Sequence, residues 1–299
     1  MMPLADLVFD TGAFSNRQLI YAIPCSVIAA MSIEQMGAVL IAFEGLSILS
    51  LLIQKKRIPA VIWIQTAITF VAFVILFMAP GNEMRVASEI TTWMPGYKEL
   101  SVGKHLFMTI QWMLSSFANE GKAFFIAIWT AGFLLLMKSK KAKVYQILAV
   151  VFSVVALLPY AGISFFSEMG IGYIDIEQRL TELPTWQTMN IQNRIAFFWW
   201  IAAVLFTMVL LWKVTGHSVF ISMVFLGGIA SEAVLHFSPT IYASGARVYY
   251  LTDLMYLFII LWMVMRMDSE KKKNLFIAGV AALGVINFLS QYSIMLLKL

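Results

Sequence analysis

Long apolar runs separated by short polar connectors are the dominant pattern of this chain. A helix needs about 20 apolar residues to cross about 30 Å of hydrocarbon, and most of the runs come close to that length. The pattern therefore predicts an all-α fold, a polytopic bundle of about nine transmembrane helices. Their expected ranges are about 19–32, 36–54, 58–78, 122–137, 144–166, 195–212, 218–237, 248–265 and 274–297.

The first run, residues 19–32, is shorter than the others. Two interpretations of it stay open: a tilted span, or a re-entrant segment that would leave eight spans. The sequence shows no internal repeat of the length that marks repeat arrays, and no linker that would divide it. Residues 1–299 are therefore predicted to form a single membrane domain.

Residues 83–120 form the first of two longer polar stretches. Within it, apolar residues recur every three or four positions, opposite a face that carries Lys104, Gln111 and Ser115. This spacing is typical of an amphipathic helix. We expect an interfacial helix at about residues 99–119 that lies on the outer surface of the bilayer.

The composition supports a membrane protein and changes how the charge is interpreted. Of the 299 residues, 61% are hydrophobic and only 12% charged, and the mean hydropathy is +0.84. A soluble domain usually has about 25% charged residues, so a soluble fold is excluded. The net charge of +5 does not indicate nucleic acid as a partner, because the basic residues lie in short connectors beside apolar runs, where they meet lipid headgroups.

The positions of lysine and arginine predict the topology. Twelve of the 21 lie in four connectors, and such loops stay in the cytoplasm. The amino terminus is then expected in the cytoplasm, unless the first run is re-entrant, and the other loops face outward, including a long one at about residues 167–194. The basic connectors are residues 55–57, 138–143, 213 and 266–273.

The stretch from Ala79 to Arg85 is the most distinctive local motif. We expect its Pro80-Gly81 pair to end a membrane helix in a turn, with Gly81 at positive φ. Asn82 and Arg85 would then lie at the outer membrane surface, where a guanidinium can bind a phosphate through two hydrogen bonds. In the alternative interpretation, Arg85 is an interfacial anchor whose charged end reaches the water.

A second outer arginine, Arg247, follows Pro239 at another predicted helix end. Together Arg85 and Arg247 could hold a phosphate or pyrophosphate at the membrane surface. Glu232, His236 and Asp253 lie near Arg247 in the sequence and are candidates for binding the substrate or for holding that arginine. The alternative is that both arginines are anchors in unrelated loops.

Two other carboxylates belong to apolar runs, where an ionisable group is costly and therefore a functional candidate. Glu34, at an outer helix start, is the best candidate for a general base, although it could also simply complement the helix dipole. Glu44 lies deeper, and we favour an internal hydrogen bond for it. The single cysteine, Cys25, excludes an internal disulfide, and with few clustered carboxylates a metal is not favoured.

The order of Glu34, the Ala79 to Asn82 turn with Arg85, and Ser238-Pro239 with Arg247 resembles a family of bacterial polytopic membrane proteins. That family is similar to the serotype-modifying glucosyltransferases of the GT-C superfamily. The resemblance implies transfer of a sugar from a polyprenyl-phosphate carrier to a cell-envelope glycan at the outer face of the membrane. It implies no cofactor, and its partners are the lipid-linked sugar, the glycan acceptor and membrane lipids.

The chain departs from that pattern in one respect. GT-C enzymes usually carry a catalytic acidic residue in the first long outer loop, whereas Asp6 and Asp10 of this chain are expected on the cytoplasmic side. Either another outer carboxylate such as Glu34 is the base, or the chain is a truncated, non-catalytic relative. The alternative from a different class is a transporter or flippase of lipid-linked glycans, for which Glu44 would be the charge near mid-membrane.

Overall fold

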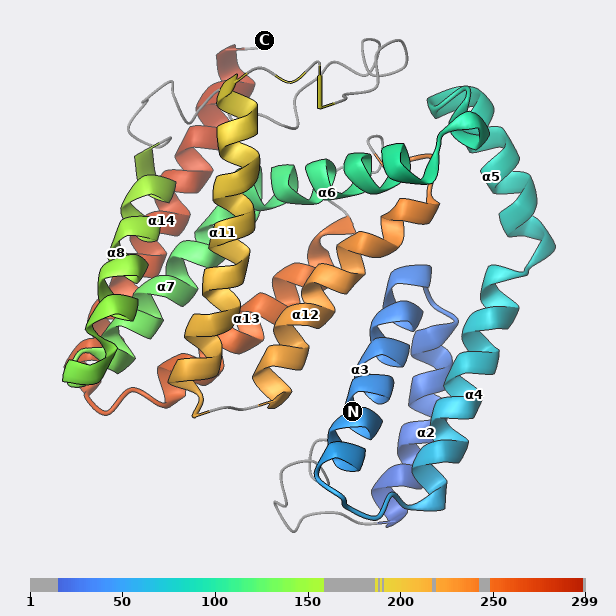
Figure 1. Cartoon of the computed structure of the whole chain (residues 1–299), viewed down its shortest axis with the longest axis horizontal. Helices are drawn as coiled ribbons and strands as arrows, with labels where there is room; N and C mark the ends of the chain where they lie inside the picture. Colours follow the sequence, from blue (N-terminus) through green and yellow to red (C-terminus); the bar gives the residue numbers. More distant parts are fainter. Residues whose placement is uncertain are drawn as a thin grey trace. The chain divides into compact units, whose positions relative to one another are not determined.

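The computed structural model is helical and describes residues 16–158, 186–187, 189, 191–216, 219–241 and 248–297 (Figure 1). No β-strand occurs among these residues, which confirms the predicted all-α class. The chain divides into two compact units. Unit 1 comprises residues 1–109 and 219–255, and unit 2 comprises residues 110–218 and 256–299. The predicted outer loop at 167–194 lies mostly outside the described residues.

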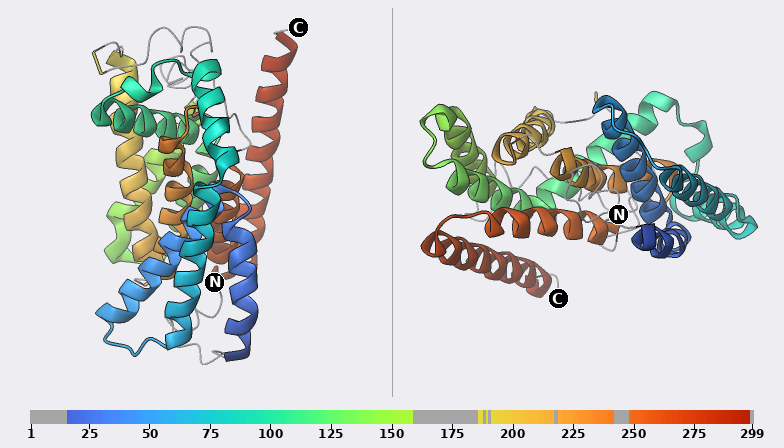
Figure 2. Two further views of the ribbon diagram at one scale, coloured as in Figure 1. Left: turned by 90° about the vertical axis from the view of Figure 1, so that its right-hand side faces the viewer. Right: turned by 90° about the horizontal axis from the view of Figure 1, so that it is seen from below.

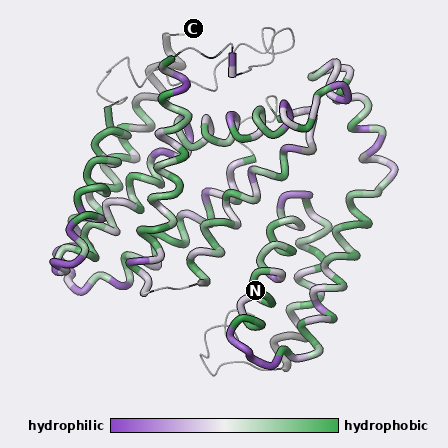
Figure 3. The backbone as a smooth tube through the Cα atoms, viewed as in Figure 1, coloured by the Kyte–Doolittle hydropathy of each residue, from purple (hydrophilic) through white to green (hydrophobic). Residues whose placement is uncertain are grey.

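Within the described part of the chain, three helices are long and apolar enough to cross a bilayer. They are α3 (Glu34–Ile53), α4 (Ala60–Phe77) and residues 193–214 of α11 (Ile191–Val214). Figure 3 shows hydrophobic residues along α3 and α4 and hydrophilic ones in the connection between them. Shorter apolar helices cover residues 21–30, 122–136, 220–236 and 250–265.

Unit 1 is built on three neighbouring helices, α2 (Asn16–Ala30), α3 and α4, which Figures 1 and 2 show side by side. Short connections at residues 31–33 and 54–59 make each helix antiparallel to the one before it. Ala30, Leu40 and Ala72 form a buried cluster between the three helices. The two alanines leave room for the helices to approach closely, as small residues do in membrane helix pairs.

A later helix of unit 1, α12 (Val219–Ala233), packs against α3. Phe43 of α3 meets Phe220 edge to face, with 5.8 Å between ring centroids. The same region buries a cluster of Phe43, Ile48, Ile62 and Met223. A short 3-10 helix, η4 (Val234–Phe237), continues α12 and contacts α3.

The Ala79 to Arg85 motif folds differently from the prediction. Helix α4 ends at Phe77, as expected, but α5 (Pro80–Trp93) begins at once, with proline in its first turn. Proline suits that position, because its missing N–H would have no helical partner there and its fixed φ is already helical. Gly81 is helical and not at positive φ, so that part of the prediction is wrong.

Helix α6 (Val102–Asn119) lies within the predicted range of 99–119 and follows a 3-10 turn, η1 (Tyr97–Glu99). Its polar residues do not share one exposed face, however: Lys104 is exposed, but Gln111 and Ser115 are buried. A local hydrogen bond makes the burial of Ser115 less costly, since the Asn119 amide donates to the Ser115 hydroxyl at 3.2 Å. Helices α6 and α13 (Tyr250–Met265) each contribute residues to both units.

Unit 2 packs its first helix, α7 (Lys122–Leu136), against α8 (Lys143–Leu157), α11 and α14 (Glu270–Leu297). Trp129 is fully buried, and its indole N–H donates to the Thr207 hydroxyl at 2.7 Å. Stacked rings of Phe152 and Phe206 lie beside it, 4.9 Å apart. The tryptophan thus contributes a large apolar surface while its one polar atom stays satisfied.

One carboxylate joins two of the basic connectors of unit 2. Asp268, before α14, contacts Lys138 at the end of α7 and lies 3.2 Å from the ammonium group of Lys272. Hydrogen bonds from Lys138 and Lys272 lower the pKa of the Asp268 carboxyl to about 2. Because this carboxylate is exposed, the ion pairs order the connector more than they stabilise the fold.

Close packing in unit 1 predicts a difference between two glycines of α3. A Cβ at Gly37 would overlap the Phe73 ring and lie 3.0 Å from the Ala30 carbonyl oxygen, whereas a Cβ at Gly45 would meet nothing within 4 Å. We expect Gly37→Ala to lower stability by about 1–3 kcal/mol through overpacking. Gly45→Ala should be neutral or add up to about 1 kcal/mol, because alanine favours a helix.

Circular dichroism measures the thermal unfolding midpoints of the wild type and both variants in the same detergent. A lower midpoint is expected for Gly37→Ala alone. Equal midpoints for the two variants would contradict the close contact between α2, α3 and α4.

Candidate functional site

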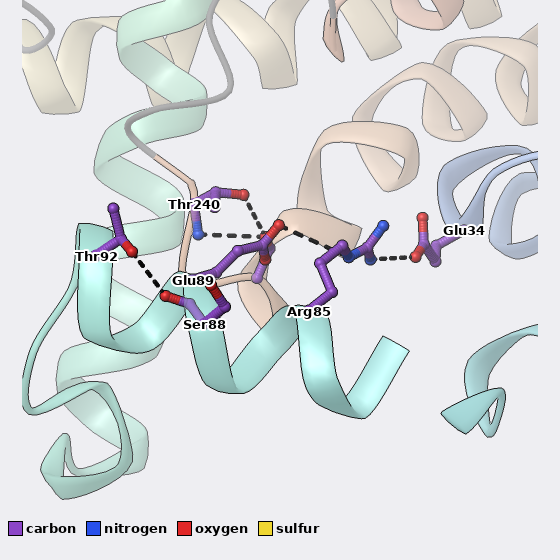
Figure 4. Close-up of polar contacts among 7 residues, drawn as sticks. Glu34, Arg85, Ser88, Glu89, Thr92 and Thr240 are labelled. Atoms are coloured by element: carbon purple, nitrogen blue, oxygen red, sulfur yellow. Dashed lines mark hydrogen bonds and ion pairs between the residues drawn. The ribbon is translucent and has the colours of Figure 1, made fainter. Parts of the chain in front are cut away.

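A cluster of three charged side chains, Glu34, Arg85 and Glu89, lies at one end of unit 1. The Arg85 Nη2 atom donates to Glu34 Oε1 at 2.5 Å, and its Nε atom is 3.6 Å from Glu89 Oε1. Figure 4 shows the guanidinium between the two carboxylates. We call these three residues the Arg85 cluster.

The fold of unit 1 explains why residues 51 positions apart meet. Because α3 and α4 are antiparallel neighbours, the first residue of α3, Glu34, lies at the same end of the unit as the last residues of α4. Helix α5 begins three residues later, at Pro80, and Arg85 occupies its second turn. Glu89 follows four positions on, where helical side chains are neighbours.

The cluster is accessible. The exposed fractions of the side chains are 52% for Arg85, 27% for Glu34 and 23% for Glu89. Two carboxylates beside one guanidinium give it a formal charge of about −1 at neutral pH. A phosphate that bound Arg85 would therefore have to displace a carboxylate or share the cation with it.

These contacts change how the two central residues are interpreted. The sequence suggests Glu34 as a base and Arg85 as either a phosphate ligand or an interfacial anchor. The structure makes Glu34 and Arg85 direct partners. An ion pair this exposed contributes only about 0–1 kcal/mol to stability, so it can be opened at little cost.

A second group in unit 1, which we call the histidine cluster, consists of Tyr97, His105, Thr109 and His236. The Tyr97 hydroxyl donates to the His236 carbonyl oxygen at 3.0 Å, and the Thr109 hydroxyl lies 2.7 Å from His236 Nδ1. The His105 ring lies 3.1 Å, through Nε2, from the Tyr97 carbonyl oxygen. The two imidazole rings meet edge to face, with 5.3 Å between centroids.

The hydrogen bonds of Thr109 connect the two histidine-bearing segments. Its hydroxyl donates to the His105 carbonyl oxygen at 2.9 Å, and a hydroxyl has only one hydrogen to donate. The His236 Nδ1 atom must then carry the proton in the bond to Thr109. Sequence reasoning missed this cluster, although the spacing of His105 and Thr109 by four on one helix face was a readable signal.

The other predicted site residues fall in different places. Asn82 is in the first turn of α5, but its side chain is outside the described part of the structure, and Arg247 is outside it altogether. Asp253 is half-buried in the first turn of α13. Glu232 is buried near the end of α12.

A spacing of four residues would place Glu232 and His236 on one face of a continuous α-helix, but the helix is not continuous here. Helix α12 ends at Ala233, and His236 belongs to the 3-10 helix η4. A 3-10 helix has about three residues per turn, so the four-residue spacing no longer aligns side chains. His236 turns instead to Thr109 and His105.

Glu44 has the internal hydrogen bonds that the sequence favours. It is 1% exposed, and its Oε1 atom accepts from Gln65 and Thr69, which confirms that prediction. Among the described residues, no three His, Cys, Asp or Glu side chains gather in a way that could hold a metal ion.

No protein-family model, no curated protein and no solved structure matches the chain. Function is therefore inferred from the contacts described above.

The environment of Tyr97 predicts a pH-dependent stability. Burial raises the pKa of the Tyr97 hydroxyl above its ordinary value of about 10. Above about pH 10 the folded chain thus keeps a proton that the unfolded chain loses. The contribution of Tyr97 to the stability of the fold is therefore full below about pH 10 and is lost as the pH rises toward the folded-state pKa. Tyr97→Phe should lower stability by about 1 kcal/mol at pH 8, through the lost bond to His236, and less at pH 11.

Thermal unfolding of both proteins at pH 8 and pH 11 checks this, with the difference between their midpoints as the readout. Tyr250→Phe, at an exposed tyrosine, is the matched control and should change stability by less than about 0.5 kcal/mol. A difference for Tyr97→Phe that stays constant between the two pH values would contradict the expected shift.

Proposed function

We propose that the chain is a GT-C-like membrane glycosyltransferase that transfers a sugar from a polyprenyl-phosphate carrier to a cell-envelope glycan. The contact between Glu34 and Arg85 carries the proposal. Transfer from a sugar phosphate needs a proton acceptor for the incoming hydroxyl and a cation for the departing phosphate. The Arg85 cluster holds one of each side by side and open to water.

The proposal includes the nine-span topology expected from the sequence. Lysine- and arginine-rich connectors would lie in the cytoplasm, so the end of unit 1 that carries Glu34 and Arg85 would face outward. Helix α5, next to that end, begins directly after the apolar helix α4. A lipid-linked donor could therefore leave its chain in the bilayer while its phosphate reaches Arg85.

Substrate binding would exchange partners within the cluster. Guanidinium binds phosphate in the same two-pronged way as it binds carboxylate, so an arriving phosphate competes with Glu34 for Arg85. Once released, the Glu34 carboxylate is available to the acceptor hydroxyl. Glu89, one helical turn beyond Arg85, would keep the guanidinium oriented throughout.

The chemical step balances with these two groups. The acceptor hydroxyl oxygen bonds to the anomeric carbon, and the bond from that carbon to the carrier phosphate oxygen breaks. The hydroxyl proton passes to Glu34, and the polyprenyl phosphate leaves with the electron pair, its growing negative charge stabilised by Arg85. No metal or organic cofactor is required.

The remaining predicted residues would bind the substrate. Asn82 lies one turn before Arg85 on α5. Arg247 would supply a second cation for the phosphate, with Asp253 six residues further along. His236 and Glu232 would contact the sugar, His236 from the segment that the histidine cluster holds in place.

A transporter or flippase of lipid-linked glycans is the second candidate. The burial of Glu44 inside α3 favours it, because ionisable groups within membrane helices often line a transport path. A non-catalytic relative of the transferases is the third candidate. Release of sugar by the purified protein distinguishes the first candidate from both others.

Replacement of Arg85 and Glu34 tests the transferase. Purified protein is supplied with a polyprenyl-phosphate hexose and an envelope glycan, and transfer to the glycan is measured. Arg85→Lys keeps the charge but loses the two-pronged geometry, and we expect about a hundredfold lower rate. Glu34→Gln, which cannot accept the proton, should lower the rate by about 100-fold or more.

Glu83→Gln is the matched control, because Glu83 is an exposed carboxylate in the first turn of the same helix and has no role in the proposed site. We expect less than about a tenfold change for it, with the thermal midpoint of each variant measured alongside. An unchanged rate in Arg85→Lys would remove the phosphate role. No transfer by any protein, wild type included, would exclude the transferase and leave the other two candidates.

The proposed topology has its own test. In a Cys25→Ser background, single cysteines at Asn82→Cys and Ser244→Cys should both react with an impermeant maleimide added outside intact cells. Gln54→Cys, an exposed position next to the basic Lys55 connector, should react only after the membrane is opened. Labelling of positions 82 and 244 from opposite sides would exclude a site that contains both Arg85 and Arg247.

A further inference from the structure

Glu44, in the middle of α3, has an environment that the proposed transferase does not use. The side chain is 1% exposed, and its Oε1 atom accepts a hydrogen bond from Gln65 Nε2 at 3.1 Å. The Thr69 hydroxyl lies 3.2 Å from the same oxygen and shares its one hydrogen between it and the Gln65 backbone carbonyl oxygen, at 3.0 Å. Both donors belong to α4 and both are neutral. An ionised carboxylate buried with neutral partners only would be costly.

The hydrogen bonds of Gln65 limit how an ionised Glu44 could be stabilised. Its two amide hydrogens are both used, one toward Glu44 and one toward the Ser26 hydroxyl at 3.1 Å on α2. Three buried oxygens then remain without a hydrogen-bond partner: Glu44 Oε2, Gln65 Oε1 and the hydroxyl of Thr66, next to Gln65 on α4. If Glu44 is ionised, Glu44 Oε2 and Gln65 Oε1 can only accept, and neither can satisfy the other. The Thr66 hydroxyl has one hydrogen, so it can satisfy only one of these two acceptors.

One proton on Glu44 would give both Glu44 Oε2 and Gln65 Oε1 a hydrogen-bond partner. We propose that Glu44 is a proton-binding site in which Oε2 carries a proton and donates it to Gln65 Oε1. Together with the bond from Gln65 Nε2 to Glu44 Oε1, this closes a two-bond ring between a carboxylic acid and an amide. The site is then neutral, and all four of these side-chain atoms have a partner.

The donors around the carboxyl group favour a proton over a metal cation. A cation such as Ca²⁺ takes six to eight oxygen ligands. Here only Glu44 Oε2, Gln65 Oε1 and the Thr66 hydroxyl lack a hydrogen-bond partner, and three oxygens are too few for such a cation. A proton needs one acceptor, and Gln65 Oε1 provides it.

The ionisable groups of the neighbouring helices lie elsewhere. Helix α4 contains none. On α2, Tyr21 and Cys25 are exposed, and Arg17 is nine residues before Ser26, about 13 Å along the helix.

On the other side of α3, helix α12 carries only Glu232, followed by His236 in η4. The contacts of Ser47 with Met223 and of Gly227 with Val39 set an antiparallel register between α3 and α12. Glu232 and His236 are thereby placed toward the start of α3, away from Glu44.

Protonation would then control the packing of three helices. With the proton present, Glu44 and Gln65 join α3 to α4, and Gln65 also reaches Ser26 on α2. Loss of the proton would leave Glu44 Oε2 and Gln65 Oε1 both as acceptors, so the bond proposed between them could not form. The site is thus a proton-sensitive link inside unit 1, and it does not depend on the transferase proposal.

Infrared difference spectroscopy tests the proposal on the purified protein at neutral pH. The spectrum of the wild type minus that of Glu44→Gln should contain the carbonyl stretch of a protonated carboxyl group. Glu270→Gln is the matched control: this carboxylate is 79% exposed and 2.7 Å from Lys273, and its removal should cost only carboxylate bands. Loss of carboxylate bands in Glu44→Gln as well would overturn the proposal.

A second variant tests the ring. Gln65→Leu removes both the donor and the acceptor of the amide but keeps the site buried. We expect the protonated-carboxyl band to remain and to move to higher frequency, because the carboxyl group has lost two hydrogen bonds. An unmoved band would show that Gln65 is not the partner of the proton.

Discussion

The antiparallel pairing of α3 and α4 is the constraint on which the rest of unit 1 depends. A polypeptide in an apolar environment must satisfy its polar groups internally, and here two adjacent helices do so for each other. Glu44 on one helix meets Gln65 and Thr69 on the other, while Gly37 lets the Phe73 ring come close. The same pairing fixes which ends of the helices lie together, and so places Glu34 near the start of α5.

Buried polar side chains are linked by chains of hydrogen bonds in both units, but the two chains end on different groups. In unit 2 the Trp129 indole donates to Thr207, whose hydroxyl in turn donates to the Ala203 carbonyl oxygen at 2.7 Å. That chain of bonds ends on the backbone and leaves nothing to titrate. In unit 1 the chain from Ser26 through Gln65 ends instead on a carboxyl group, so its completeness depends on a proton. The network around Trp129 is therefore structural, whereas the network around Glu44 can respond to pH.

Much of the helical pattern could be predicted from the sequence, because apolar runs and helix breakers act locally. The run predicted at 36–54 corresponds to α3, Glu34–Ile53, and the end of α4 before Pro80 was readable. The predicted turn at Pro80-Gly81 was wrong, because proline is compatible both with the end of one helix and with the first turn of the next. The pairings of Glu34 with Arg85 and of His105 with His236 are long-range and follow from packing, which composition and spacing do not encode.

Helix α3 carries both carboxyl groups for which we propose a chemical role, Glu34 and Glu44. Glu34 and Glu44 are ten residues apart on it, about 15 Å along the axis, one in an exposed ion pair and the other in a buried hydrogen-bond network. A helix is stiff over three turns, so a change in how Glu44 meets α4 would shift the position of Glu34 relative to Arg85 at the start of α5. Since the exposed pair contributes about 0–1 kcal/mol, even a small displacement is enough to open it. The buried carboxyl group can therefore influence the exposed pair through packing alone, with no contact between them.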